Sequence, residues 1–123
     1  MDLGSIAREL VAGCREGREA ENLGKLYSEH AVSVEGADFG GTGREAVGLE
    51  AIRGKHAWWD ANFEVLSATV SDPMLHGDDR FAVLFGARTR NRETGAEEEM
   101  TEVAVYHVAD GRIVREEFFY APE

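Results

Sequence analysis

The chain has 123 residues, of which 43% are hydrophobic and 30% are charged, a composition typical of a single globular domain over residues 1–123. Thirteen Lys and Arg residues against 24 Asp and Glu residues give a net charge of −11. A chain this acidic repels phosphate backbones, so we expect no nucleic-acid partner.

The single cysteine, Cys14, excludes an intrachain disulfide and a cysteine-based zinc site. The first residues lack the basic stretch and apolar run of a signal peptide, and no 18 consecutive residues are apolar. We therefore expect a cytoplasmic protein without a membrane partner.

The first half of the chain predicts three helices. Apolar residues recur at helical spacing from Leu3 to Cys14, and a second short helix follows from about Glu19 to Ser28. The segment AVSVEG predicts a short strand, and the glycines between Gly36 and Gly48 predict a mobile loop. The third helix carries one stripe, made of Leu49, Ile52, His56, Trp59 and Phe63.

The second half predicts antiparallel strands, joined by turns at Asp72-Pro73, MLHGDD, Thr94-Gly95 and Asp110-Gly111. A two-residue turn at Thr94-Gly95 would place Arg90 opposite Glu99, a favourable pair of charges. Helices followed by a strand meander predict an α+β fold. The alternative, a flat ferredoxin-like sandwich, would need a helix after Phe63 that the sequence does not offer.

The last turn decides which way the final carboxylates point. A type I turn with Gly111 in the left-handed region places Glu116 opposite Ala104, with Glu102 diagonal to it on the same face. In a plain two-residue hairpin, Glu116 would instead lie opposite Val105.

With the type I turn, the two faces of the last strands differ in character. One face collects Glu102, Tyr106, Glu116, Phe118 and Tyr120. The other collects Val103, Val105, Ile113 and Phe119, and this set is too apolar to be left to solvent. We expect a second copy of the chain to cover the second face.

Three stretches resemble the SnoaL-like domains of the nuclear transport factor 2-like superfamily: LYSEHAVSVEG, GLEAIRGKHAWWDANFEV and EVAVYHVADGRIVREEFFY. The resemblance implies a cone, in which three N-terminal helices and a strongly curved, mostly antiparallel sheet enclose one central pocket. It also implies a homodimer formed through the convex sheet face. This fold hosts isomerases, cyclases, dehydratases, epoxide hydrolases and plain binding modules, so the resemblance leaves the activity open.

Glu35 is the first candidate for chemistry. LYSEHAVSVEG resembles the segment that ends, in ketosteroid isomerases of this superfamily, in the carboxylate that moves the substrate proton. Glu35 falls at that position. An apolar pocket raises the pKa of a carboxylate toward neutrality, as a general base requires. The alternative is a solvated Glu at the end of a strand.

Glu116 and Glu102 are the next candidates. Placed diagonally on neighbouring strands, they could share a proton, and Tyr106 on the same face could donate to a developing oxyanion. The alternative is that both carboxylates reach water or are held by an Arg. Related cyclases often carry an inward His and Asp in the last strand, where this chain has Glu116 and Phe118, so the cyclase pattern is incomplete.

The candidate ligand-binding residues are Tyr106, His56, Trp59, Phe85, Phe118 and Tyr120. His56 can equally be a core residue, as can the aromatic side chains. The four histidines lack metal-ligand spacing and no nucleotide-binding motif occurs, so we expect neither a metal nor a cofactor.

Two functions remain open from the sequence. The chain is either a lyase or isomerase that moves a proton on a small, largely apolar molecule, or a non-catalytic binding or dimerisation module of the same fold. The first requires Glu35 or Glu116 inside, desolvated and without an Arg partner. The second requires carboxylates that their neighbours neutralise.

Overall fold

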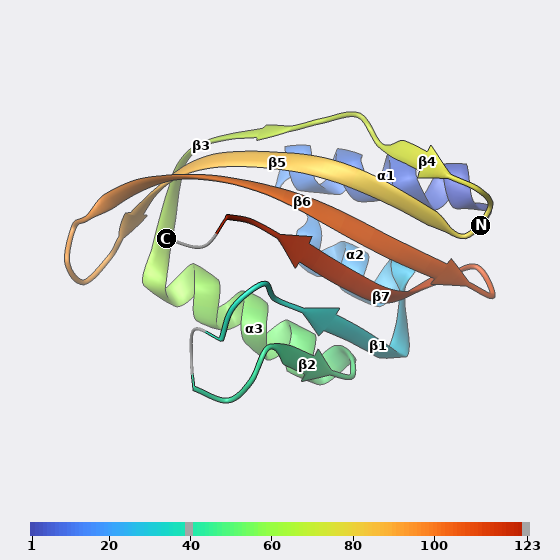
Figure 1. The fold of residues 1–123 in the computed structure, drawn as a ribbon, viewed down its shortest axis with the longest axis horizontal. Coiled ribbons are helices and arrows are strands. Elements are labelled where there is room, and N and C mark those ends of the chain that lie inside the picture. Colours follow the sequence, from blue (N-terminus) through green and yellow to red (C-terminus); the bar gives the residue numbers. More distant parts are fainter. Residues whose placement is uncertain (39–40, 122–123) are drawn as a thin grey trace.

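The computed structural model describes residues 1–38 and 41–121. Its elements are α1 (Leu3–Glu16), α2 (Glu19–Leu26), β1 (Tyr27–Val34), β2 (Glu45–Val47), α3 (Leu49–Asn62), β3 (Phe63–Val70), β4 (Met74–His76), β5 (Arg80–Asn91), β6 (Glu97–Ala109) and β7 (Arg112–Phe119), shown in Figure 1.

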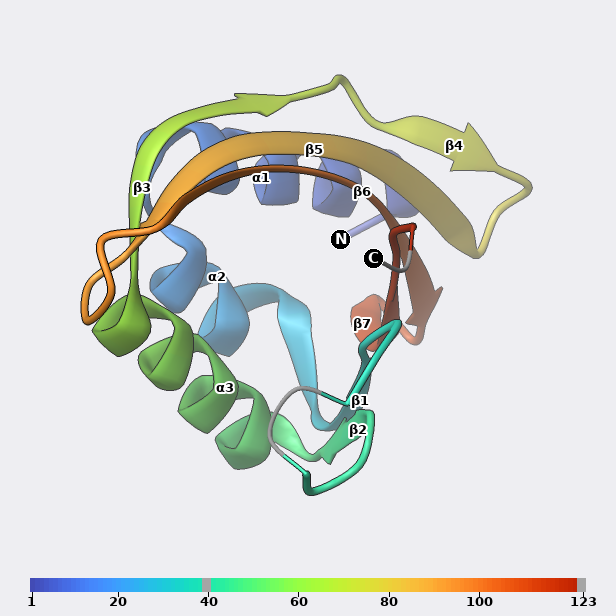
Figure 2. The same ribbon diagram turned by 60° about the vertical axis from the view of Figure 1, so that its left-hand side comes forward.

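Seven strands form one sheet in the order β2-β1-β7-β6-β5-β3, and β4 pairs with β5. Every pair is antiparallel except β1 with β7, which run parallel. The sheet curls without closing, and α3 crosses its open side between β2 and β3 (Figure 2). The predicted α+β cone is therefore confirmed, and no helix follows Phe63 in the described part of the chain.

The core lies between α1, α2 and the concave face of the sheet. Ile6, Ala7, Leu10 and Val11 form the buried stripe of α1, and they belong to one cluster with Phe81, Val83, Ala104 and Ile113 of the sheet. Asp2 starts α1, because its carboxylate accepts a hydrogen bond from the backbone N–H of Ser5 at 2.8 Å. The strands that pack in this core also carry the inward-facing residues of the candidate site.

Three element boundaries differ from the prediction. The second helix ends at Leu26 rather than Ser28, so Tyr27 already belongs to β1 and its side chain is buried. The predicted loop from Gly36 to Gly48 contains β2, although its residues 39–40 lie outside the described residues. The segment MLHGDD contains the short strand β4 before it turns.

The predicted register between β5 and β6 was wrong by two residues. Arg90 lies opposite Glu97 rather than Glu99. The turn is wider than two residues because the Asn91 side chain accepts hydrogen bonds from two backbone N–H groups within it, at 2.9 and 3.1 Å. An even shift leaves every side chain on the face predicted for it.

The predicted turn between β6 and β7 was also wrong. Asp110 and Gly111 both have positive φ, 52° and 73°, and form a two-residue hairpin. That hairpin alone would turn Glu116 outward. A bulge leaves Val114 without an opposite residue, and the strand beyond it returns to the original phase. Glu116 therefore faces the concave side after all, opposite Tyr106 rather than Ala104.

The same hairpin corrects the predicted convex face. Ile113 is fully buried in the core, because it follows the two-residue turn on the concave side. Val103 and Phe119 remain outside, joined by Leu84 of β5 in one row across three strands. Phe119 is 54% exposed and Leu84 is 44% exposed. An apolar strip thus runs over the outside of the sheet.

Candidate functional site

Six side chains from the end of β1, from α3, β6 and β7 face one another across the concave side. We call them the inner cluster: Glu35, Lys55, Glu102, Tyr106, Glu116 and Phe118. They are linked by an ion pair, a ring contact and interactions between their charges.

Glu116 is the most deeply buried carboxylate of the inner cluster, with 2% of its surface exposed. Tyr27 Oη donates a hydrogen bond to its Oε1 at 2.6 Å, and Ser33 Oγ lies 3.3 Å from its Oε2. Burial raises the pKa of Glu116, and the hydrogen bond from Tyr27 works in the opposite direction. Its neighbour Glu117 points outward, where His107 Nε2 lies 2.8 Å away.

Lys55 joins the two polar ends of the inner cluster. Its ammonium forms an ion pair with Glu35, donates to Ser33 Oγ at 2.7 Å and lies 4.6 Å from the centre of the Phe118 ring. The Lys55 and Glu35 side chains are only 26% and 24% exposed. Tyr120 Oη also donates to Glu35 Oε2 at 3.3 Å. Glu35 is therefore a paired carboxylate rather than an isolated one.

Sequence reasoning missed Lys55, because a Lys on an amphipathic helix normally lies in water. The spacing of Lys55 from the apolar residues of the same helix could have revealed its inward position. Lys55 follows Ile52 by three positions and precedes Trp59 by four, which places it on the inward stripe of α3.

Glu102 is the carboxylate without a partner. It makes no hydrogen bond or ion pair with any residue that the structure describes, and it lies opposite Phe85 on the concave face. Burial, the largest cause, and the charge of Glu35 together raise the pKa of Glu102 to about 7, although Lys55 acts in the opposite direction.

The predicted diagonal pairing of Glu102 with Glu116 is wrong. Glu116 lies opposite Tyr106, four positions beyond Glu102 and about 13 Å along an extended strand. The charge of Glu35 consequently affects the pKa of Glu102 more than the charge of Glu116 does.

Tyr106 is a buried hydroxyl on the same face. Only 3% of the residue is exposed, and its ring stacks on Phe81 with centroids 4.8 Å apart. Burial, followed by the negative charge of Glu116, raises the pKa of Tyr106, so the phenol keeps its proton. The hydroxyl makes no hydrogen bond to any residue in the described part of the chain. It is therefore a donor that a ligand oxygen can use.

Three further predicted residues, His56, Trp59 and Phe85, lie outside the inner cluster. Burial, followed by the charge of Lys55, lowers the pKa of His56, so this imidazole is neutral near pH 7. Trp59 stacks on Phe63 at 4.5 Å, at the end of α3. His56, Trp59 and Phe85 are all half-buried, so part of each remains accessible to solvent or to a ligand.

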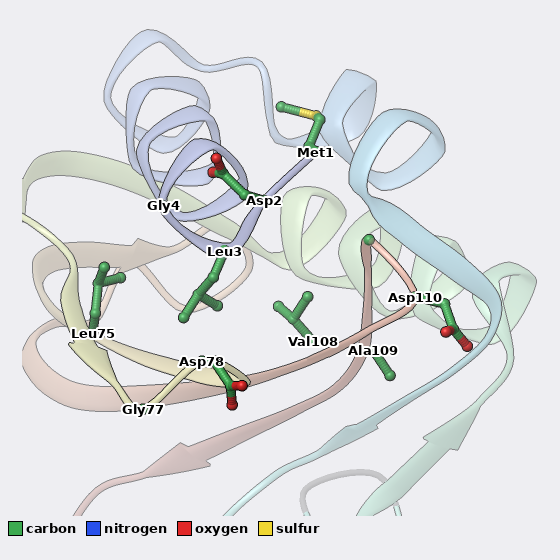
Figure 3. A pocket seen from close by; sticks show the side chains of 11 residues that line it. Met1, Asp2, Leu3, Gly4, Leu75, Gly77, Asp78, Val108, Ala109 and Asp110 are labelled. Carbon is green, nitrogen blue, oxygen red and sulfur yellow. The ribbon is translucent and has the colours of Figure 1, made fainter.

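Two surface hollows lie away from the inner cluster. The larger, of about 510 Å³, lies between the start of α1, the loop after β4 and the turn between β6 and β7 (Figure 3). Three carboxylates line it: Asp2, Asp78 and Asp110. A second, of about 270 Å³, lies over β3 and β5. Within residues 1–38 and 41–121 no group of side chains could hold a metal ion, and no helix is long and apolar enough to cross a membrane.

The sequence pattern of the SnoaL-like domain matches residues 4–120, nearly the whole chain. This protein belongs to the SnoaL-like family. A search of curated proteins found no match to its sequence.

Solved structures agree with this family. A candidate SnoaL-like polyketide cyclase from Mesorhizobium loti is 32% identical, with a TM-score of 0.90 over 98% of this chain and 100% of the other. A candidate isomerase from Bacillus subtilis is 22% identical, with a TM-score of 0.76 over 96% and 85% of the two chains. A nuclear transport factor 2-like protein of unknown function from Burkholderia pseudomallei is 15% identical, with a TM-score of 0.72 over 95% and 88%.

The inner cluster gives this SnoaL-like domain three carboxylates with different chemistry. Glu35 is held by a cation, Glu116 is held by two hydroxyl groups, and Glu102 is held by neither. A carboxylate with a pKa near the working pH can both take and return a proton. Of the three, Glu102 best fits that requirement.

Proposed function

We propose that this SnoaL-like domain binds a small, largely apolar molecule on its concave face and moves a proton on it, in a lyase or isomerase reaction. Glu102 is the group that takes and returns the proton. The observation that carries the proposal is an inward carboxylate that has no described partner and a pKa of about 7.

Three further residues support the same function. Tyr106 supplies a protonated hydroxyl on the strand that carries Glu102, suited to donate to an oxygen on which negative charge develops. Phe85, opposite Glu102, and Phe118, under Lys55, offer apolar surface to the body of the molecule.

A non-catalytic binding module is the second candidate, and one observation favours it. Glu35 and Glu116, the carboxylates first expected to do chemistry, already have partners. If Glu102 served only to orient a ligand, the same residues would form a binding site without a reaction.

Deuterium exchange separates the two functions. The protein is incubated in D2O with 2-tetralone, an apolar bicyclic ketone with acidic C–H groups, and exchange is followed by proton NMR. We expect wild type to accelerate exchange, with a rate that rises as the pH passes 7 and Glu102 ionises. Glu102→Gln should lower the rate by about 100-fold or more.

The matched control is Glu99→Gln, which removes one carboxylate from the same strand at an exposed position paired with Arg88. This variant should exchange the ketone as fast as wild type. If Glu102→Gln kept full activity, the role assigned to Glu102 would be wrong. If 2-tetralone bound without exchange, the binding module would be the better description.

A further inference from the structure

The charges of the inner cluster do not balance. Glu35, Glu102 and Glu116 supply three carboxylates, and Lys55 is the only cation of the cluster. That ammonium is already engaged by Glu35, by Ser33 and by the face of Phe118. An anionic ligand would therefore meet like charges and find no cation of the cluster without a partner.

Two polar groups of the cluster still lack a partner among the described residues. Glu102 offers a carboxylate that accepts hydrogen bonds, and the Tyr106 hydroxyl, in a residue only 3% exposed, can donate one. Among the described residues, the one side-chain polar atom that is fully buried without a partner is Asn22 Oδ1, so neither Glu102 nor the Tyr106 hydroxyl is sealed from solvent. A ligand can therefore reach both groups and form hydrogen bonds with them.

The aromatic side chains also favour a positively charged ligand. The Lys55 ammonium already lies over the Phe118 ring at 4.6 Å. Phe85 lies directly opposite Glu102, so its ring is within reach of a group bound to that carboxylate. Aromatic faces attract cations, and the attraction is stronger where water is displaced.

We propose that the ligand of the inner cluster carries a protonated amine on a small apolar body, with the ammonium bound to Glu102 beside Phe85. This inference rests on the proposed function, because it names the class of molecule that the same site takes. A bound ammonium lowers the pKa of Glu102 and keeps it ionised, so the carboxylate is a weaker base in this complex than in the free protein.

The test uses three molecules that share the tetralin skeleton and carry a positive, a neutral or a negative group at the same carbon: 2-aminotetralin, 2-tetralol and tetralin-2-carboxylic acid. Their affinities are measured by isothermal titration at pH 8, where the amine is largely protonated. We expect the amine to bind at least tenfold more tightly than the acid, with the alcohol between them. Glu102→Gln should weaken the amine about tenfold and change the alcohol less than threefold.

Glu99→Gln again serves as the control, because it changes the net charge of −11 by the same single unit at an exposed position. It should leave all three affinities unchanged. Equal losses of amine affinity in the two variants would mean that net charge, not Glu102, selects the ligand, and would overturn the inference. Tighter binding of the acid than of the amine would also overturn the inference, but the proposal that this face binds a small molecule would stand. If none of the three bound, the proposed function itself would fail.

Discussion

At the scale of single residues, the inner cluster stores unfavourable electrostatic energy. Burial raises the pKa of both Glu102 and Glu116, which means that the folded protein holds these protons more tightly than the unfolded chain does. Folding is consequently less favourable at pH values at which the unfolded chain would release these protons. The same burial that prepares Glu102 for proton transfer lowers stability above neutral pH.

Replacing Glu102 by Gln tests this cost. The ordinary pKa of the side chain is 4.5 and the folded value is about 7, so stability falls as the pH rises between these values. We expect Glu102→Gln to match wild type near pH 4 and to exceed it at pH 8 by on the order of 2 kcal/mol. Urea unfolding at the two pH values measures the difference. Glu99→Gln should show no such change between them, and parallel pH profiles for wild type and Glu102→Gln would contradict the assignment.

The sequence predicted the positions of some site residues correctly and missed others. The inward direction of Glu116 was correct, although two errors contributed: the shorter turn and the bulge at Val114 each shifted the register by one residue, and a shift of two keeps the side chain on the same face. The hydrogen bonds from Tyr27 and Ser33 join residues more than 80 positions apart, which no local pattern reveals. Lys55 was missed because hydrophobic patterns treat every Lys as solvent-exposed.

At the scale of elements, α1 and α2 pack closely at a glycine. A side chain at Gly13 would clash with the amide nitrogen of Asn22, which donates to the backbone oxygen of Glu9 at 3.0 Å. Helix interiors normally gain stability when Gly is replaced by Ala. Here the close approach of the two helices should reverse that rule.

We expect Gly13→Ala to destabilise the protein by about 1–3 kcal/mol, because the added methyl group must displace the buried Asn22 side chain and break its hydrogen bond to Glu9. Gly54→Ala is the matched control, since Gly54 lies in α3 with nothing within 4 Å of the new methyl group. This variant should gain up to about 1 kcal/mol. Thermal unfolding of both variants measures the effects. A gain in stability from Gly13→Ala would show that α2 can move aside without cost.

Element types were easier to predict than the pairing between them. Turn residues and alternation placed most strands correctly, because these signals are local. Pairing failed where one side chain changed the turn, as Asn91 does between β5 and β6. Both sheet faces were nevertheless mostly assigned correctly, because the errors left the two-residue alternation intact.

At the scale of the whole molecule, the convex face is the largest feature that the inner cluster does not use. Leu84, Val103 and Phe119 lie in one row across β5, β6 and β7 and remain accessible. Exposed apolar rows of this kind mark interaction sites. We propose that two copies of the chain pair through this face.

Leu84→Glu tests the pairing. We expect wild type to sediment as a dimer at micromolar concentration and Leu84→Glu to sediment as a monomer, because a charge buried within an apolar interface stays unpaired. Val47→Glu is the control, since Val47 is 67% exposed on β2, away from this row. It should leave the dimer intact. A monomeric wild type would rule out the pairing.

The parallel pairing of β1 with β7 also has a consequence for how the molecule is made. Ser33 and Glu116, hydrogen-bonded in the finished protein, are 83 positions apart. A ribosome releases the chain from its N-terminal end, and early segments begin to fold before later ones exist. Tyr27 and Ser33 therefore cannot bind the Glu116 carboxylate until more than 80 further residues have been synthesised. The centre of the cone can be completed only after β7 has been synthesised.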